Sequence, residues 1–392
     1  MSSIHAEHLW NKSFILCLIN NLFIFIFYFA QTTILPIYIL NDLNGNITQA
    51  GLALTLFLAS SIAIRPFTGL IIEKIGLKKA LYISESFFVL LSFAYIFADN
   101  LTLLLVIRLL QGIWFSILTT AMIPIVNDFI PNQRKGEGMG YFVMSVNLAI
   151  VLGPMLGLIL IQPWGYIPVA TLLAAIVFIG YLFCFLIPIQ TQFQTVKRKT
   201  KISVHDFVEI KALPVAMMAM LISFSYASIM SFISTYAESK NLLTYASLFF
   251  AVFAISMMLL RPFTGKLYDS KGPAYVVYPA IVSFSIGLFI LSQIHSAAGL
   301  LISAVFIGIG FGSAQPCLQT QAIQAVARER VGHASSTFYT FYDIGIALGS
   351  FILGIVITHY QYSIAYILCA ILTLLSLLFY RFVVQSKSGL DS

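Results

Sequence analysis

Twelve long apolar runs constrain this chain more than any other feature of its sequence. Each is long enough to cross the hydrocarbon core of a membrane as a helix, which takes about 20 apolar residues. The chain has 392 residues, of which 60% are hydrophobic and only 9% charged, whereas soluble domains are roughly a quarter charged. The runs cover residues 14–40, 49–72, 80–98, 101–126, 138–161, 165–188, 213–237, 244–264, 275–294, 298–325, 335–358 and 363–384. The sequence therefore predicts an all-α integral membrane protein with twelve transmembrane helices and excludes a soluble enzyme.

The basic residues predict the orientation of the chain. Of the 21 Lys and Arg, seventeen fall in segments that are cytoplasmic if the N-terminus is inside, three lie within the runs, and Lys240 alone is external. Cytoplasmic loops of membrane proteins carry such an excess of Lys and Arg. We therefore expect a multi-pass protein of the cell (cytoplasmic) membrane with both termini in the cytoplasm. The positive net charge is explained by orientation, so we expect no nucleic-acid partner.

A pentapeptide repeated at half the chain length indicates an internal duplication. The sequence Arg-Pro-Phe-Thr-Gly at residues 65–69 recurs at 261–265, an offset of 196 residues. The same offset carries Gly153 onto Gly349. Two six-helix halves of one topology follow, as in secondary transporters built from parallel repeats, whose substrate site lies between the halves. We expect the halves to cover residues 1–189 and 212–392, joined by a cytoplasmic linker over 190–211.

The cytoplasmic loop after the second run carries charges flanked by glycines. Glycine lets helix ends approach closely, and acids and bases can make charge-assisted contacts at the cytoplasmic mouth. The pattern resembles the signature of the major facilitator superfamily, G-x3-[DE]-[RK]-x-G-x-[RK]-[RK], with Glu where Asp is commoner. It is formed by Gly69, Glu73, Lys74, Gly76, Lys78 and Lys79.

The second half holds a degenerate copy of this loop. Gly265, Asp269 and Gly272 remain, but Ser270 replaces the base. Just before the two loops, Arg65 and Arg261 occupy equivalent places in the inner half of their runs. They are expected either to reach the cytoplasm with their long side chains or to form an inner gate.

The fourth run contains a deeply placed arginine. Arg108 lies about 12 Å from Asn100, which marks the outer end of the run, at 1.5 Å per residue. A guanidinium at that depth costs several kcal/mol unless it faces a polar cavity or a partner. With Gln111 and Gly112 it resembles the superfamily motif R-x-x-Q-G, and the resemblance implies that Arg108 assists proton coupling. The alternative is a structural arginine bonded to backbone carbonyls.

The fifth run carries small residues on one face. The pattern resembles the superfamily's antiporter motif G-x8-G-x3-G-P-x2-G-G, with Ala and Leu in place of two glycines. Small residues spaced by four allow close helix packing, and a proline permits a bend. The resemblance implies an exporter, and a plain packing face is the alternative. The positions are Gly140, Ala149, Gly153, Pro154 and Gly157.

Two carboxylates are candidates for proton coupling. Asp343 falls near the middle of the eleventh run, where a charged carboxylate is costly and a group that binds and releases a proton is suited to the environment. Its counterpart in the first half is Asn147, and Tyr339 lies on the same helical face. A structural ion pair with an arginine is the alternative for Asp343. Glu85 lies closer to the cytoplasmic end of its run, and we expect a surface pair with a lysine in preference to a proton site.

Polar side chains within the runs are candidates for lining a substrate cavity. Each alone is more often a helix–helix contact than a substrate contact. The candidates are Asn20, Asn21, Tyr28, Gln31, Gln111, Trp114, Asn147, Tyr226, Gln315, Gln319 and Tyr339. The four cysteines lie in apolar runs without metal-ligand spacing, so we expect no metal and no cofactor other than a proton gradient.

Taken with the resemblance to bacterial permeases grouped under arabinose or drug efflux, these features imply a proton antiporter that exports a small organic molecule by alternating access. We expect it to work as a monomer in the lipid bilayer, with protons and the small molecule as its partners. One alternative is a proton-symport importer or facilitator of a sugar or other small solute. A different alternative is a transport-inactive membrane receptor or scaffold.

Overall fold

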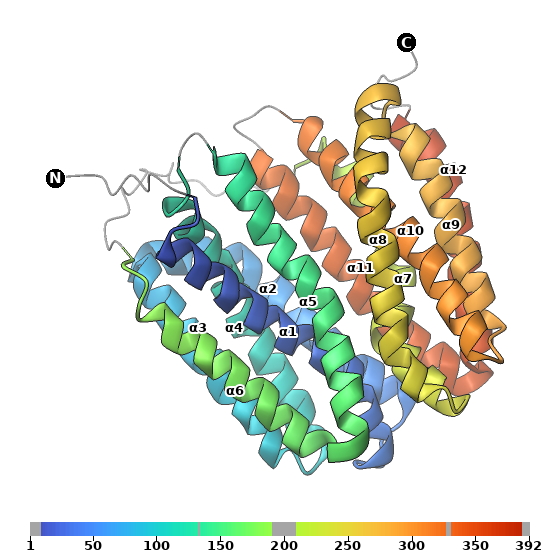
Figure 1. Ribbon diagram of the computed structural model, residues 1–392, viewed down its shortest axis with the longest axis horizontal. Helices are drawn as coiled ribbons and strands as arrows, with labels where there is room; N and C mark the ends of the chain where they lie inside the picture. The colour runs from blue at the N-terminus through green and yellow to red at the C-terminus, as the bar shows by residue number, and fades with distance from the viewer. Residues whose placement is uncertain (1–8, 132–133, 190–208, 327–330, 386–392) are drawn as a thin grey trace. The chain divides into compact units, whose positions relative to one another are not determined.

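The computed structural model describes residues 9–131, 134–189, 209–326 and 331–385. Within these residues the chain forms twelve helices that are long and apolar enough to cross a membrane (Figure 1), which confirms the predicted all-α fold. Helices suit lipid because they satisfy every backbone N–H and C=O internally. The helices are α1 (Lys12–Asn41), α2 (Ile47–Ile75), α3 (Leu77–Ala94), α4 (Leu101–Asp128), α5 (Lys135–Trp164), α6 (Tyr166–Cys184), α7 (Leu213–Ser239), α8 (Leu243–Lys271), α9 (Ala274–Ser292), α10 (Ala297–Gln324), α11 (Val331–Tyr360) and α12 (Tyr362–Phe379).

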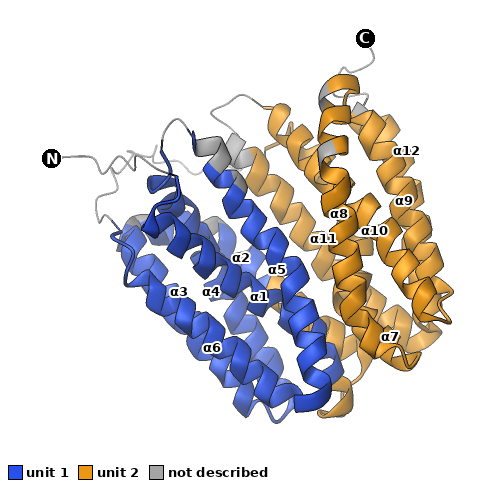
Figure 2. Ribbon diagram, in the orientation of Figure 1, with its two compact units in different colours: residues 1–38, 59–198 blue, residues 39–58, 199–392 orange. Residues whose placement is uncertain are grey.

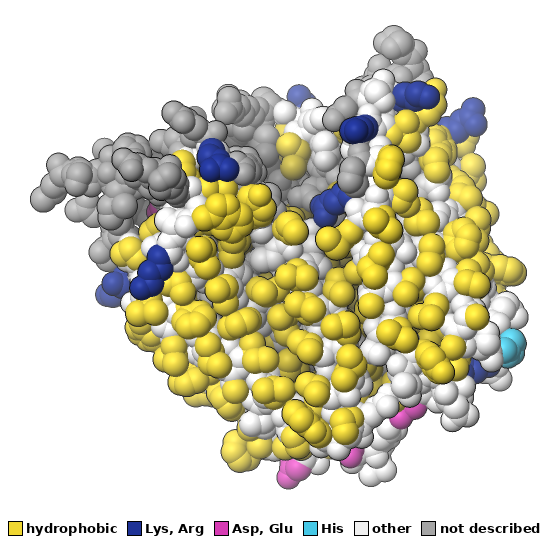
Figure 3. All heavy atoms as spheres, viewed as in Figure 1, with side chains coloured by type: hydrophobic (Ala, Val, Ile, Leu, Met, Phe, Trp, Pro, Cys, Tyr) yellow, Lys and Arg dark blue, Asp and Glu magenta, His cyan; other side chains and the backbone are white. Residues whose placement is uncertain are grey.

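Large apolar side chains are exposed on the outer faces of the helices, as expected for a surface that faces lipid. Leu90, Leu259 and Phe382 are each more than 60% exposed, which suits hydrocarbon as a solvent. Hydrophobic side chains cover the visible faces of the helices, with most of the visible Lys and Arg toward one end of them and most of the visible Asp and Glu toward the other (Figure 3). Several helices extend past the apolar runs; α5 begins at Lys135, because backbone hydrogen bonding continues beyond the hydrocarbon.

The duplication seen in the sequence is repeated in the structure. Adding 196 to the bounds of α2, α4 and α5 gives the bounds of α8, α10 and α11. Even the N-caps correspond: the side chain of Asn100 accepts a hydrogen bond from the Leu103 N–H at 2.9 Å, and that of Ser296 accepts one from the Gly299 N–H at 3.2 Å.

The chain divides into two compact units (Figure 2). One consists of residues 1–38 and 59–198, the other of residues 39–58 and 199–392. The expected boundary differs in one respect, since the first part of α2 packs with the second unit. Most of the expected linker, residues 190–208, lies outside the described residues.

Glycines allow close helix packing within each unit. A Cβ on Gly153 of α5 would lie 2.9 Å from the Ala30 N and the Ile26 O of α1. The equivalent Gly349 of α11 is packed just as closely, because a Cβ added to it would collide with the Phe224 O of α7. Such contacts below 3.0 Å leave no room for a side chain. The pair α1 and α5 and the pair α7 and α11 therefore use the same packing at equivalent positions.

The turn between α11 and α12 has Gln361 at the position where the equivalent turn between α5 and α6 has a glycine. Gly165, between α5 and α6, has φ 74° and ψ 178°, and its N–H donates to the Ile161 O at 2.8 Å. Gln361 has φ 89° and ψ 160°, and its N–H donates to the Ile357 O at 3.0 Å. This region of backbone conformation is essentially restricted to glycine. Gln361 therefore carries strain that Gly165 does not.

Replacing Gln361 with glycine is expected to stabilise the protein. Relief of the strained backbone is worth on the order of 1–3 kcal/mol. The Gln361 side chain is exposed, so the substitution removes little packing. Thermal unfolding of the purified protein in detergent measures the effect, and Gln361→Ala, which keeps a Cβ, is the matched control. A Gln361→Gly protein no more stable than Gln361→Ala would contradict the assignment of strain.

Candidate functional site

Arg108 lies inside the first unit within a chain of hydrogen bonds. It is 1% exposed, and its Nη1 donates to the Tyr95 hydroxyl at 3.4 Å. The Tyr95 hydroxyl donates to the Gln111 Oε1 at 2.8 Å, and the Gln111 Nε2 donates to the Ser92 Oγ at 3.1 Å. Tyr95 begins the short 3-10 turn that follows α3, so these hydrogen bonds join the C-terminal end of α3 to α4. These contacts fix the guanidinium in a buried position.

A second polar cluster in this unit surrounds Gln31. The Tyr166 hydroxyl of α6 donates to the Gln31 Oε1 at 2.9 Å, whereas the Gln31 Nε2 is buried without a hydrogen-bond partner. The Tyr166 ring stacks on Tyr38 with centroids 3.9 Å apart, and the Tyr38 hydroxyl donates to the Ala98 O at 2.9 Å. An unpartnered amide donor inside a protein is costly, which makes Gln31 a candidate for binding a polar group.

The other expected cavity residues of the first unit make contacts between its own helices. The Asn21 Nδ2 donates to the Ser145 Oγ of α5 at 2.8 Å. Tyr28 stacks over Phe115 at 5.2 Å, and Trp114 stacks on Phe87 of α3 at 4.3 Å. The Asn147 side chain is half-buried on α5.

The position of Glu85 differs from the expected surface pair with a lysine. Glu85 is 0% exposed, and its Oε2 accepts a hydrogen bond from the Cys184 Sγ of α6 at 3.0 Å. The Asn20 Nδ2 of α1 donates to the same sulfur at 3.1 Å. The expectation was wrong because it considered only how far Glu85 lies from the end of α3. The side chain lies on a face of α3 that points toward α1 and α6.

In the second unit, Asp343 is half-buried on α11 near Tyr339 and Tyr342. The two tyrosine rings meet edge to face at 6.5 Å, and the Ser223 Oγ of α7 donates to the Tyr342 O at 2.8 Å. A Cβ on Gly345, two residues after Asp343, would collide with Ser223. Asp343 therefore lies on a stretch of α11 that is packed closely against α7.

The remaining cavity candidates of the second unit lie on α7 and α10. Tyr226 is 3% exposed and stacks on Phe311 with centroids 3.8 Å apart and planes 10° apart. Gln315 and Gln319 are half-buried on α10, one turn apart.

The two copies of the repeated pentapeptide have the same local structure. The Thr68 Oγ1 donates to the Arg65 O at 2.8 Å, and the Thr264 Oγ1 donates to the Arg261 O at 3.1 Å. A Cβ on Gly69 or Gly265 would meet no atom within 4 Å.

Each copy is followed by a glycine that ends its helix. Gly76 has φ 86° and Gly272 has φ 89°, which favours glycine at both turns. The Lys78 Nζ lies 5.8 Å above the Tyr82 ring, while Lys74 and Lys79 are exposed. The side chains of Glu73 and Asp269, and the surroundings of Gly140, lie outside the described part of the chain.

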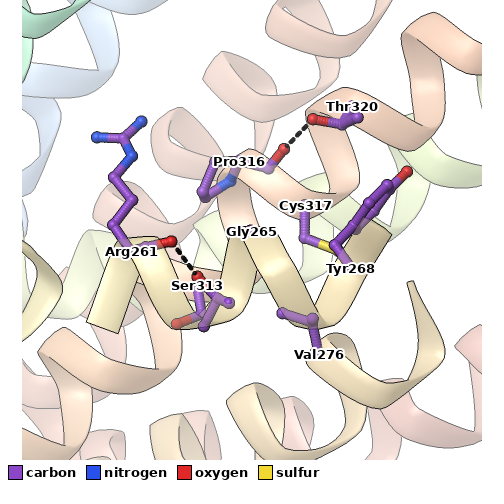
Figure 4. Close-up of a pocket in the computed structure, with 9 residues that line it drawn as sticks. Arg261, Gly265, Tyr268, Val276, Ser313, Pro316, Cys317 and Thr320 are labelled. Carbon is purple, nitrogen blue, oxygen red and sulfur yellow. Dashed lines mark hydrogen bonds between the residues drawn. The ribbon is translucent and has the colours of Figure 1, made fainter. Parts of the chain in front are cut away.

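A cavity of about 190 Å³ lies beside Arg261 within the second unit (Figure 4). The Arg261 side chain extends away from the Tyr268 ring, which lies two turns further along α8. The hydroxyl of Thr320 donates to the Pro316 O of its own helix at 2.9 Å, so it is already occupied as a donor. The lining residues are Arg261, Thr264, Gly265, Tyr268, Val276, Ser313, Pro316, Cys317 and Thr320.

The small-residue face of α5 packs on α1. Beside Gly153, a Cβ on Gly157 would lie 2.8 Å from the Ile34 Cγ2. Ala149 and Pro154 are buried. Helix α5 continues through Pro154 without interruption.

Three residues of these clusters were not expected from the sequence. Tyr95, Tyr166 and Cys184 each bond a predicted site residue. Tyr95 precedes Arg108 by 13 positions and belongs to another helix, and Cys184 lies in an apolar run, so neither carries a sequence signal of its own. The polar hydroxyl of a tyrosine within an apolar run is the one clue for Tyr166, because buried tyrosines usually find a hydrogen-bond partner.

Twelve membrane-spanning helices in a duplicated arrangement, with buried polar residues in each half, define a multi-pass membrane transporter. The family model described as Major Facilitator Superfamily matches residues 17–350, and the chain belongs to that superfamily. It is similar to the multidrug resistance protein MdtG of Enterobacter lignolyticus, with 24% identity over 81% of this chain and 78% of that protein. It is 24% identical to MdtG of Escherichia coli over 80% of this chain and 79% of that protein.

Solved structures share the fold. The crystal structure of the nucleoside transporter NupG matches with a TM-score of 0.75 at 13% identity, covering 95% of this chain and all of that chain. A POT family transporter in complex with 5-aminolevulinic acid matches with a TM-score of 0.79 at 14% identity, covering 99% of each chain.

Removing the Tyr95 hydroxyl is expected to destabilise the first unit more than removing an ordinary tyrosine hydroxyl. Tyr95→Phe deletes the hydrogen bond from the charged Arg108, worth about 1.5–3 kcal/mol, together with the neutral bond to Gln111, whereas Tyr38→Phe deletes one neutral bond, worth about 0.5–1.5 kcal/mol. Denaturant unfolding of both variants in detergent measures the difference. Equal losses in the two variants would show that Tyr95 does not hold Arg108.

Proposed function

We propose that this transporter is a proton-coupled antiporter that exports small organic molecules, drugs or metabolites, by alternating access. The observation that carries the proposal is the contact of Gly153 and Gly157 of α5 with α1, which places the small-residue face of the antiporter-like motif directly against a neighbouring helix. The relatives named multidrug resistance proteins, which align over about four fifths of the chain, support efflux of drug-like compounds.

Protons are the proposed energy source. Asp343 is the proposed coupling carboxyl, because an ionisable residue within a membrane helix is costly to keep and is usually functional. Arg108 is proposed to bias the protonation of a nearby carboxyl in the first half, from a position fixed by Tyr95. The excess of Lys and Arg in one set of loops supports cytoplasmic termini. We further propose that the monomer is the working unit.

Alternating access requires contacts that form in one state and break in another. The first part of α2 offers such contacts with α11, inside the second unit. The Thr48 Oγ1 donates to the Gly354 O at 3.2 Å, and the Thr55 Oγ1 donates to the Ala347 O at 2.9 Å. Between them, a Cβ on Gly51 would collide with the Ser350 O. We assign these contacts to an outer gate.

Asp343→Asn is expected to abolish transport driven by a pH gradient while leaving the fold intact, because an amide cannot carry the coupling proton. Proteoliposomes with an imposed pH gradient and the dye ethidium measure this. Asp42→Asn, at an exposed acid, is the matched control and should transport like the natural protein. Gradient-driven transport by Asp343→Asn at the control rate would remove this residue from the coupling role.

Gly153→Leu is expected to insert normally but to transport at least about fivefold more slowly, because overpacking costs about 1–3 kcal/mol. The control is Gly299→Leu on α10, where the nearest atom to an added Cβ is 3.6 Å away. Both variants are compared by membrane content and by ethidium efflux from cells. An unimpaired Gly153→Leu protein would show that this contact is not needed for movement.

A further inference from the structure

Three polar side chains meet between α1, α3 and α6, away from the Arg108 chain. Asn20, Glu85 and Cys184 are each buried in the first unit. The Asn20 Nδ2 donates to the Cys184 Sγ at 3.1 Å, and the Cys184 Sγ donates to the Glu85 Oε2 at 3.0 Å. Two hydrogen bonds therefore link the three side chains in a row, with the thiol between the amide and the carboxyl.

The two remaining oxygens of this cluster have no hydrogen-bond donor. The Glu85 Oε1 and the Asn20 Oδ1 are both buried without a hydrogen-bond partner. The backbone of α6 lies against the asparagine oxygen, because a Cβ on Gly180 would collide with it. Two unsatisfied acceptors in an apolar interior, one of them on an anion, would be strongly unfavourable. A proton on the carboxyl would remove the buried charge and supply the hydrogen that this cluster lacks.

We propose that Glu85 is a proton-binding site that holds its proton in this conformation and donates it from Oε1 to the Asn20 Oδ1. The proton closes a ring in which each of the three side chains donates once and accepts once. The ring fastens α1 to α3 and α6. This inference goes beyond the proposed antiport, because the ring requires a proton on Glu85 whether or not transport is driven by protons.

Among the described residues, the titratable groups next to the ring are thiols and tyrosines, which carry no positive charge. Cys17 on α1 and Cys184 on α6 are thiols. Tyr82 of α3 donates to the Cys184 O at 3.2 Å, and Tyr181 of α6 bonds the Ser86 Oγ at 2.7 Å. The charged residues of α4, which also packs on α3, are placed elsewhere: Arg108 bonds Tyr95, and Asp128 is the last residue of the helix.

Infrared spectroscopy of the full chain in proteoliposomes tests the proposal, because a protonated carboxylic acid has a C=O stretch that a carboxylate lacks. At neutral pH we expect this band in the natural protein, its loss in Glu85→Gln, and its retention in Ser84→Ala, a matched control whose hydroxyl bonds only its own helix. An Asn20→Leu protein should keep the band at a shifted frequency, because the acceptor is gone.

Two outcomes would overturn the proposal. One is a spectrum of Glu85→Gln identical to that of the natural protein in this region. The other needs no substitution: labelling the glutamate carboxyls with ¹³C shifts no acid band. That result is expected if Glu85 is ionised and accepts a hydrogen bond from a rotated Asn20 amide. The labelled sample keeps the test decisive even if Glu85→Gln fails to fold.

Thermal unfolding gives an independent measurement. The native state would bind a proton that the unfolded state releases near neutral pH, so the melting temperature of the natural protein should fall as pH rises. Glu85→Gln supplies an amide hydrogen in place of the proton and should lack this part of the pH dependence. Equal pH dependence in the two proteins would contradict a bound proton.

Discussion

Close packing of backbones holds each unit of this protein together, because lipid removes the usual reason for apolar side chains to associate. In hydrocarbon, a leucine gains little by leaving lipid for protein, so helix contacts depend on shape and on the few polar groups between helices. The contacts of Gly153 with α1 and of Gly349 with α7 are the clearest examples. Their equivalence under the 196-residue offset shows that the duplicated units kept the packing as well as the helix bounds.

The same environment makes every buried polar group a strong constraint. The guanidinium of Arg108 and the carboxyl of Glu85 lie in one unit, yet each has its own set of partners. Tyrosine hydroxyls surround the first, and a thiol with an amide surrounds the second. Such groups orient their helices, since moving one helix would leave several atoms unsatisfied at once.

The sequence was sufficient for the fold and insufficient for most of the site. Apolar runs and the repeat predicted twelve helices, because both signals are local or strictly periodic. The environment of Glu85 was not predictable, because depth along a helix does not tell which neighbour its side chain faces. The partners of Arg108 and Gln31 were also hidden, since Tyr95 and Tyr166 come from other helices. Side chains that meet across helices leave no spacing rule in a single sequence.

The one-residue turns have a consequence for how neighbouring helices can move. Gly76 alone separates α2 from α3, Gly165 alone separates α5 from α6, and Gln361 alone separates α11 from α12. A single residue spans less than 4 Å. In the folded protein, the last residue of one helix and the first residue of the next lie within about 8 Å of each other along the chain. The facing ends of each pair are therefore tied together at one surface of the membrane, and an axial shift of one helix has to carry the end of its neighbour with it.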